Sequence, residues 1–259
     1  MAIASTPSLS PDHLLVSGHA GSCLLYYGVQ RGKSRQMIAE FAALIPESIL
    51  DKSGAVFYSG RAAFSAPSRL YILGSNPGGS PEEMPDATVK KHTQMVLGER
   101  RENWSAYRDE KWHDEYKKGE YGIQPQVLYL LGELKLDPGL IPASNVVFVR
   151  SSQTKDIEHD FRKYAECCWR FHEAVIERLH VRAILCLGWD AGNWVLDKYG
   201  LQNTKPCNTF VEKNKRHWTN SSYISPSGIG IVIVNHPSRV DWKNPNTDPS
   251  PLVRNMLNS

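Results

Sequence analysis

The sequence predicts an α/β fold, and more specifically a three-layer αβα sandwich around a four-stranded parallel sheet. Four short apolar runs, each of a length suited to a buried strand, alternate with segments of helical periodicity. Strands that are apolar along their whole length are typical of parallel sheets, which helices cover on both faces. The predicted strands are residues 69–73, 145–149, 183–188 and 229–234.

Helical periodicity separates these runs. The clearest helix is predicted from Ile157 to His180, where apolar side chains recur at spacings of three and four. A first helix is expected over residues 33–50, and a shorter one begins at Gln124-Pro125, because proline suits the first helical turn. A further helix passes through Trp194 and is expected to have Gly200 as its C-cap, and a short one ends the chain.

Length and composition favour one globular domain. The chain has 259 residues, 41% of them hydrophobic, which suits residues 21–259 forming a single domain with a polar insert at about 80–121. Residues 1–20 are expected to be a flexible tail, and they lack the pattern of a secretory signal. No apolar run approaches the roughly 20 residues of a membrane span, so no membrane association is expected. The 5 cysteines include no CxxC pair and predict unpaired thiols in a reducing compartment, the cytoplasm or a nucleus.

One segment concentrates positive charge. The net charge is +3, but residues 203–218 hold five basic or potentially basic side chains against the single Glu212: Lys205, Lys213, Lys215, Arg216 and His217. One interpretation is a solvated loop. The other is a face that contacts phosphates, which would involve Lys213, Lys215 and Arg216.

Two of the predicted strands run directly into polar loops. Gly74-Ser75-Asn76-Pro77-Gly78 follows the first, and Asn235-His236-Pro237-Ser238-Arg239 follows the last. Loops at the carboxyl ends of parallel strands are where ligands bind in open α/β sheets.

These loops carry side chains suited to a reaction. The Asn76 amide can orient a water molecule, His236 can hydrogen-bond an oxygen that gains negative charge, and Ser238 can hold a phosphate. Taken singly, Asn76 is ordinary turn chemistry and His236 a core histidine, but their joint placement favours a site. The chain has no motif for a covalent nucleophile or a nucleotide-binding phosphate loop.

At these residues the chain resembles the uracil-DNA glycosylase superfamily. Gly74 to Gly78 is similar to the first motif of the branches that use asparagine, which are the mismatch-specific and the single-strand-selective monofunctional enzymes. His236-Pro237-Ser238 is similar to the second motif. The order of the four strands, the long helix before the third and Gly188 after it also agree, so the resemblance covers about Arg61 to Trp242.

The resemblance implies a monofunctional DNA glycosylase that flips a base from the stack and hydrolyses its N-glycosidic bond, leaving an abasic site. Asn76 would position the water, His236 would stabilise the departing base, and Ser238 would hold a backbone phosphate. Arg239 would be the wedge that fills the gap, within the loop Arg239-Val240-Asp241-Trp242. The implied enzyme is a monomer that binds DNA and needs no cofactor or metal. Its implied substrate-binding residues are Gly74, Ser75, Pro77, Gly78, Ser151 and Asn145, and its DNA-binding residues are Ser238, Arg239, Lys213, Lys215 and Arg216.

The sequence departs from the superfamily in how it would recognise the base. Relatives place an asparagine after the second strand, where this chain has Arg150-Ser151-Ser152. A competing register uses Asn145, but the strand-end register is preferred because Asn145 is expected at the opposite edge of the sheet. The aromatic residue that would stack on the base is also ambiguous, with Trp104, Tyr107 and Tyr58 as candidates.

Three functions follow from these observations. The first is a glycosylase for a deaminated or damaged base such as uracil. The second is a glycosylase that removes a bulky modified base from viral DNA as a defence enzyme, which the missing asparagine and the polar insert suggest. The third is a nucleic-acid binding module that uses the same fold without catalysis.

Overall fold

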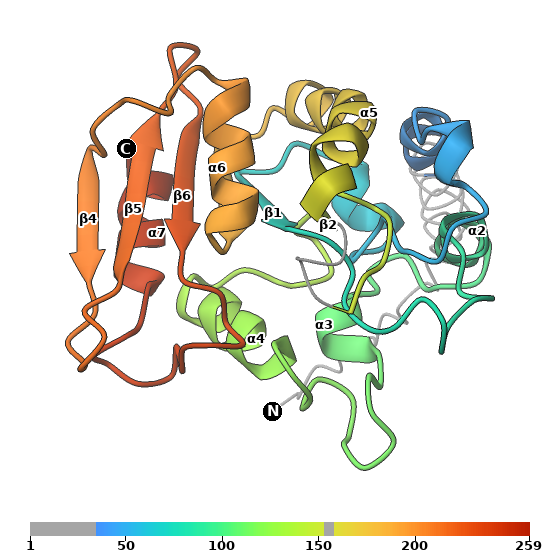
Figure 1. The fold of residues 1–259 in the computed structure, drawn as a ribbon, viewed down its shortest axis with the longest axis horizontal. Coiled ribbons are helices and arrows are strands. Elements are labelled where there is room, and N and C mark those ends of the chain that lie inside the picture. Colours follow the sequence, from blue (N-terminus) through green and yellow to red (C-terminus); the bar gives the residue numbers. More distant parts are fainter. Residues whose placement is uncertain (1–34, 153–157) are drawn as a thin grey trace, which may run out of the picture.

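The computed structural model describes residues 35–152 and 158–259. They form an α/β fold around a six-stranded mixed sheet with strand order β2-β1-β3-β6-β5-β4 (Figure 1). The strands are β1 (Leu70–Gly74), β2 (Ala143–Asn145), β3 (Ala183–Leu187), β4 (Asn208–Val211), β5 (Thr219–Ile224) and β6 (Gly230–Val234).

The sheet is larger than the four parallel strands that the sequence predicts. β2, β1, β3 and β6 are parallel to one another, but β5 pairs antiparallel with β6 and β4 pairs antiparallel with β5. The prediction missed β4 and β5 because neither is a continuous apolar run. β5 carries the buried polar residues Asn220, Ser221 and Ser222, and most of β4 is exposed.

The second strand lies earlier in the chain than predicted. β2 ends at Asn145, and the apolar run after it, residues 146–149, is buried but lies outside the named strands. This run continues alongside the loop that follows β1, since Val146 N–H donates to the Gly74 carbonyl and Val147 N–H to the Ser75 carbonyl. Asn145 is the register partner of Gly74, so it lies at the carboxyl end of the parallel strands. The expectation that it lies at the opposite edge is therefore wrong.

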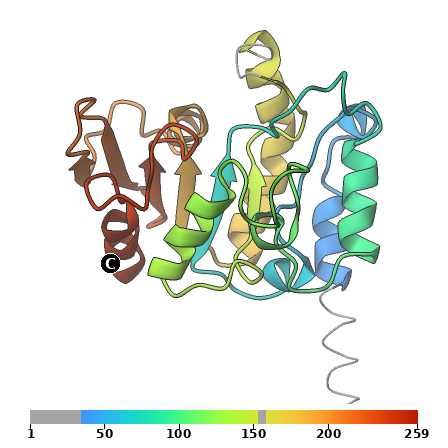
Figure 2. The ribbon, with the colours of Figure 1, turned by 90° about the horizontal axis from the view of Figure 1, so that it is seen from below.

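Helices cover both faces of the sheet (Figures 1 and 2). Alternate residues of each parallel strand belong to two separate apolar clusters, one with Tyr71 and Leu73 and the other with Leu70 and Ile72. A helix over 35–42, α2, α5 and α6 pack on the first face, α4 and α7 pack on the second, and the short α3 contributes to both clusters. The helix bounds are α2 (Val89–Gly98), α3 (Ala106–Asp109), α4 (Gln124–Glu133), α5 (Glu158–Arg178), α6 (Trp189–Lys198) and α7 (Ser250–Asn258), with 3-10 helices at Glu47–Ile49 and Arg61–Phe64.

Most helices agree with the expected positions. α4 begins at Gln124, and α6 is followed by Gly200 with φ of +67°, the left-handed geometry that ends helices. The predicted first helix is shorter than expected, because the helical residues end at 42 and a separate 3-10 turn begins after Pro46. The expected tail, residues 1–20, lies outside the described residues, as does Ile157. Within the described ranges, no helix has the length and apolarity to cross a membrane.

Candidate functional site

The strand order reverses between β1 and β3, which places a topological switch point at the carboxyl end of the parallel strands. From β1 the chain continues to β2 on one side, and from β2 it crosses to β3 on the other side of β1. Loops leave the strands in opposite directions at such a reversal, and ligands bind there in open α/β sheets. The loop with Asn76 follows β1 and the loop with His236 follows β6, which is two positions away in the sheet. With a strand spacing of about 4.8 Å, the two strand ends lie about 10 Å apart.

The Asn76 loop is fixed to the chain that follows β2. Asn76 Nδ2 donates to Ser151 Oγ at 2.8 Å and to the Pro77 carbonyl at 3.0 Å. Ser151 N–H in turn donates to the Pro77 carbonyl at 3.1 Å. Because both hydrogens of the Asn76 amide are used in these bonds, Oδ1 is the atom left to accept a hydrogen bond from a water or ligand.

The other members of the first motif differ in exposure. Gly74 and Pro77 are buried, Ser75 and Asn76 are half-buried, and Gly78 is exposed. The Ser75 hydroxyl oxygen is buried and has no hydrogen-bond partner among the described residues.

Asn145 lies against the end of β1. It is 7% exposed, and a Cβ atom added to Gly74 would lie 2.2 Å from Asn145 Oδ1. Only glycine at position 74 therefore leaves room for this amide. Burial raises the pKa of the Tyr58 hydroxyl to about 12, against the opposing effects of Arg150 and of a hydrogen bond with Asn145. Asn145 and Ser151, which the sequence offers as alternatives, both contact the Asn76 loop.

His236 has a defined proton position. Its Nδ1 accepts from Ser238 N–H at 3.2 Å and lies 2.7 Å from Ser238 Oγ. With Nδ1 as the acceptor, the proton of the neutral ring is on Nε2, which can donate to a ligand. Burial lowers the pKa of His236, and Arg239 lowers it further, while Asp190 opposes them. The ring is therefore held neutral near pH 7, with a hydrogen-bond donor at Nε2.

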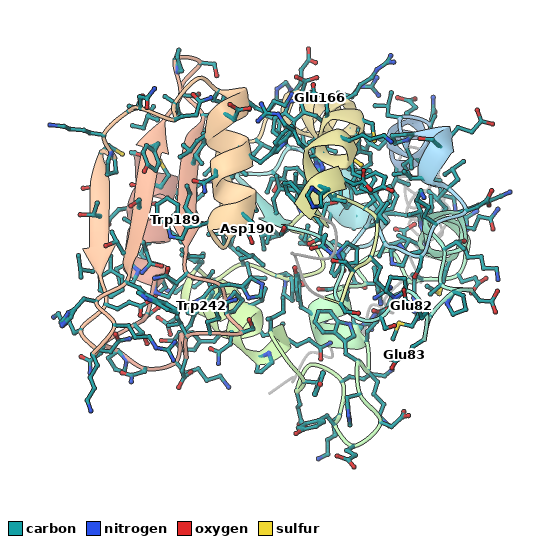
Figure 3. The ribbon with its side chains drawn as sticks, in the orientation of Figure 1. Glu82, Glu83, Glu166, Trp189, Asp190 and Trp242 are labelled. Atoms are coloured by element: carbon teal, nitrogen blue, oxygen red, sulfur yellow. The ribbon has the colours of Figure 1, made fainter. Side chains whose placement is uncertain are left out.

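Two features of α6 border His236. Gly188, the N-cap of α6, has φ of +102°, and a Cβ there would lie 3.4 Å from the His236 Cβ. Asp190 lies in the first turn of α6, at its lower end in Figure 3, next to Trp189. The helix therefore begins immediately beside the imidazole.

In the loop that follows His236, the side chains differ in their exposure to solvent. Ser238 and Arg239 are exposed, whereas Val240 and Trp242 are buried. Trp242, labelled in Figure 3, donates its indole N–H to the Asn235 carbonyl at 3.2 Å. Of the predicted wedge segment, Arg239 is thus available to a partner, while Trp242 supports the loop from inside. No pattern in the local sequence predicts this role of Trp242.

The candidate stacking residues are not equivalent. Trp104 and Tyr107 are 2% and 3% exposed, so neither presents a ring face to a ligand. Tyr58 is half-buried, with ring centroids 5.9 Å from Tyr107 and 6.3 Å from Trp112. Trp112 is also half-buried and was missed as a candidate, because nothing in its sequence context distinguishes it from neighbouring surface aromatics.

The last part of the basic segment, residues 212–218, forms the turn between β4 and β5. Lys213, Lys215 and Arg216 are exposed there. Arg216 Nη1 donates to the Arg239 carbonyl at 3.0 Å, and its guanidinium lies 4.7 Å from the centre of the Trp218 ring. Of the predicted basic residues, Arg216 thus contacts the loop that carries His236.

Comparisons with known proteins add no relatives to this picture. The chain matches no known protein-family model, and it matches no curated protein. Within residues 35–152 and 158–259, no group of three or more His, Cys, Asp or Glu side chains could hold a metal ion.

Proposed function

We propose that this protein is a monofunctional DNA glycosylase that hydrolyses the N-glycosidic bond of a flipped-out base. The observation that carries the proposal is the pairing of Asn76 and His236 across the switch point of the sheet. Asn76 offers an acceptor oxygen and His236 a neutral donor, on strand ends about 10 Å apart, a separation that suits a pyrimidine ring and its sugar between them.

The two groups suit the two ends of the breaking bond. When the bond from C1′ to the base nitrogen breaks, the sugar gains positive charge and the base takes the electron pair. Asn76 Oδ1 would accept a hydrogen bond from the water that then bonds to C1′, and the released water proton balances the charge of the departing base. An amide is a poor base, but an oxocarbenium-like centre needs an oriented water more than a deprotonated one. His236 Nε2–H would donate to a base oxygen as it becomes negative.

The surroundings of Asn145 support a pyrimidine such as uracil as the base. Its amide lies at the carboxyl end of β2 beside Gly74, and an amide presents one donor and one acceptor, which complement the edge of uracil. Ser151 is engaged with Asn76, which makes it a support for the loop in this proposal.

The turn between β4 and β5, residues 212–218, is called the basic turn, and it would bind the DNA backbone. Lys213, Lys215 and Arg216 are exposed, and Arg216 contacts the loop of Ser238 and Arg239. Phosphate contacts of this kind position a protein on DNA without reading its sequence. Arg239 would fill the space left by the flipped base.

The test is release of free base from defined oligonucleotides, scored as alkali-labile abasic sites. Uracil opposite A, uracil opposite G and single-stranded uracil are compared with thymine opposite G, hypoxanthine, and hydroxymethylated or glucosylated cytosine. Asn76→Ala is expected to lower turnover by about 10²- to 10³-fold, the usual cost of losing a polar group that acts on the transition state. Its DNA affinity should persist, and the exposed Asn203→Ala serves as the matched control.

Each outcome distinguishes the candidate functions. Cleavage at uracil substrates supports the proposal with Asn145 reading the base. Cleavage confined to decorated cytosines would replace it with a defence enzyme for modified DNA. DNA binding without release of any base would leave only a binding module.

A further inference from the structure

The acidic residue of the basic turn is buried. Glu212 is 1% exposed although Lys213, Lys215 and Arg216 around it are exposed. Glutamate is rarely this buried, since removing a carboxylate from water is costly unless it is hydrogen-bonded. The local sequence, a charged loop, does not predict that Glu212 is buried.

The Glu212 carboxylate holds the residue that precedes His236. Glu212 Oε1 accepts from Asn235 Nδ2 at 2.6 Å, and Oε2 accepts from Asn214 Nδ2 at 2.8 Å. Asn235 itself is 5% exposed, and its N–H donates to Asn220 Oδ1 at 2.7 Å. A hydrogen bond to an ionised carboxylate is about twice as strong as one between neutral groups.

The same turn holds the loop at a second point. Arg216 Nη1 donates to the Arg239 carbonyl at 3.0 Å. Arg239 N–H in turn closes the His236 turn by donating to the His236 carbonyl at 2.9 Å. The turn over residues 212–218 therefore contacts the loop on both sides of the imidazole, at Asn235 and at Arg239.

These contacts come from the hairpin of β4 and β5, the two strands that lie outside the parallel part of the sheet. β4 and β5 pack little apolar surface, since most of β4 is exposed and the buried residues of β5 are largely polar. Besides the pairing of β5 with β6, the hairpin is bonded to the His236 loop through Glu212 and Arg216. An apolar side chain at position 212 would leave the buried Asn235 amide without this acceptor, so the carboxylate and the loop depend on each other.

We propose that Glu212 is a positioning residue, which, together with Arg216, clamps the loop of residues 235–239 and fixes the His236 imidazole for base release. This inference rests on the proposed function for its catalytic consequence, whereas the clamp itself is a property of the free protein. Phosphate binding at the basic turn and the placement of His236 are thereby linked through one element of the fold.

The clamp is tested first without any substrate. Glu212→Gln keeps the size of the side chain but removes the charge and places an amide nitrogen where Asn235 or Asn214 needs an acceptor. Hydrogen exchange of the Ser238 and Arg239 amides, measured by NMR, is expected to accelerate by about 10-fold. The Val147 amide, bonded to the Asn76 loop, is the internal reference, and the exposed Glu47→Gln is the control variant. Unchanged exchange at both amides would overturn the clamp.

The catalytic consequence is tested by a double-mutant cycle. Glu212→Gln is expected to lower kcat for base release by about 10- to 10²-fold, the effect of a small misplacement, with KM for DNA changed by less than about 3-fold. In a His236→Ala background the same change should have no further effect, whereas with Asn76→Ala the two losses should multiply. Equal losses in all three backgrounds would show a general structural defect and refute the positioning role.

The two tests separate the inference from the proposed function. If the wild-type protein releases no base, the proposed function fails while hydrogen exchange still decides the clamp. If Glu212→Gln does not fold, Asn235→Ala removes the same hydrogen bond from the other side and is measured in the same two ways.

Discussion

A buried histidine predicts how the stability of this protein depends on pH. His172 lies on α5 and is fully buried. Its Nδ1 lies 2.8 Å from the Tyr71 hydroxyl, and its Nε2 lies 3.3 Å from the Val146 carbonyl, directly after Asn145. The neutral ring satisfies both contacts, accepting from Tyr71 and donating to Val146. Burial lowers the pKa of His172 to about 3, against opposing backbone hydrogen bonds.

The sign of the effect follows from the two protonation states. An unfolded histidine has a pKa of about 6.5, so between pH 6.5 and about 3 the unfolded chain binds a proton that the folded chain does not. Stability is therefore complete above pH 6.5 and is lost as the pH falls toward 3. Each pH unit in this window corresponds to about 1.4 kcal/mol, which gives a loss of about 2 kcal/mol between pH 7 and pH 5 from this group alone.

The measurement is urea unfolding at pH 7, 6 and 5 for the wild type and for His172→Gln. Glutamine can donate to one partner and accept from the other but does not titrate, so the variant begins about 1–3 kcal/mol less stable at pH 7. The gap between the proteins should then narrow by about 2 kcal/mol at pH 5. His159→Gln is the control, since this exposed ring stays in water in both states. Parallel loss of stability in wild type and His172→Gln would refute the reasoning.

Three further changes probe the site and its support. Gly74→Ala places a methyl group 2.2 Å from Asn145 Oδ1, so kcat for base release should fall while the DNA dissociation constant, measured by fluorescence anisotropy, stays within about 3-fold. Arg216→Ala should weaken DNA binding on all sequences and reduce the slope of log affinity against log salt by about 1; an unchanged slope would place the DNA elsewhere. Gly192→Ala on α6 brings a Cβ within 2.6 Å of Ile233 on β6 and should cost about 1–3 kcal/mol in thermal unfolding, unless the helix shifts away.

The sequence predicts those strands that are buried on both faces. β1, β3 and β6 have no exposed residue, so each is a continuous apolar run that stands out from its surroundings. β5 is buried at residues 220–223, but Asn220 and Ser222 are paired with groups 15 residues away in the chain, Asn235 N–H and Cys207 Sγ. Burial that depends on such partners leaves no periodic pattern in the local sequence.

The candidate site is predictable to the same extent. Asn76 and His236 could be found because each follows an apolar run that ends at the carboxyl edge. Asn145 was misplaced because residues 146–149 are apolar through packing beneath α5 and not through pairing in the sheet. Glu212 gave no signal, since its burial results from the hairpin that brings it to Asn235.

The arrangement of the strands also has a consequence for how the two halves of the candidate site assemble. β4, β5 and β6 are consecutive in the chain and are joined by the short segments 212–218 and 225–229, so their pairing closes only small loops. Pairing of β1 with β2 must instead close a loop over residues 75–142, with a larger entropic cost before any contact is gained. We expect the hairpin and the His236 loop to acquire protection early in refolding, and the Asn76 half to become ordered only when the parallel core closes.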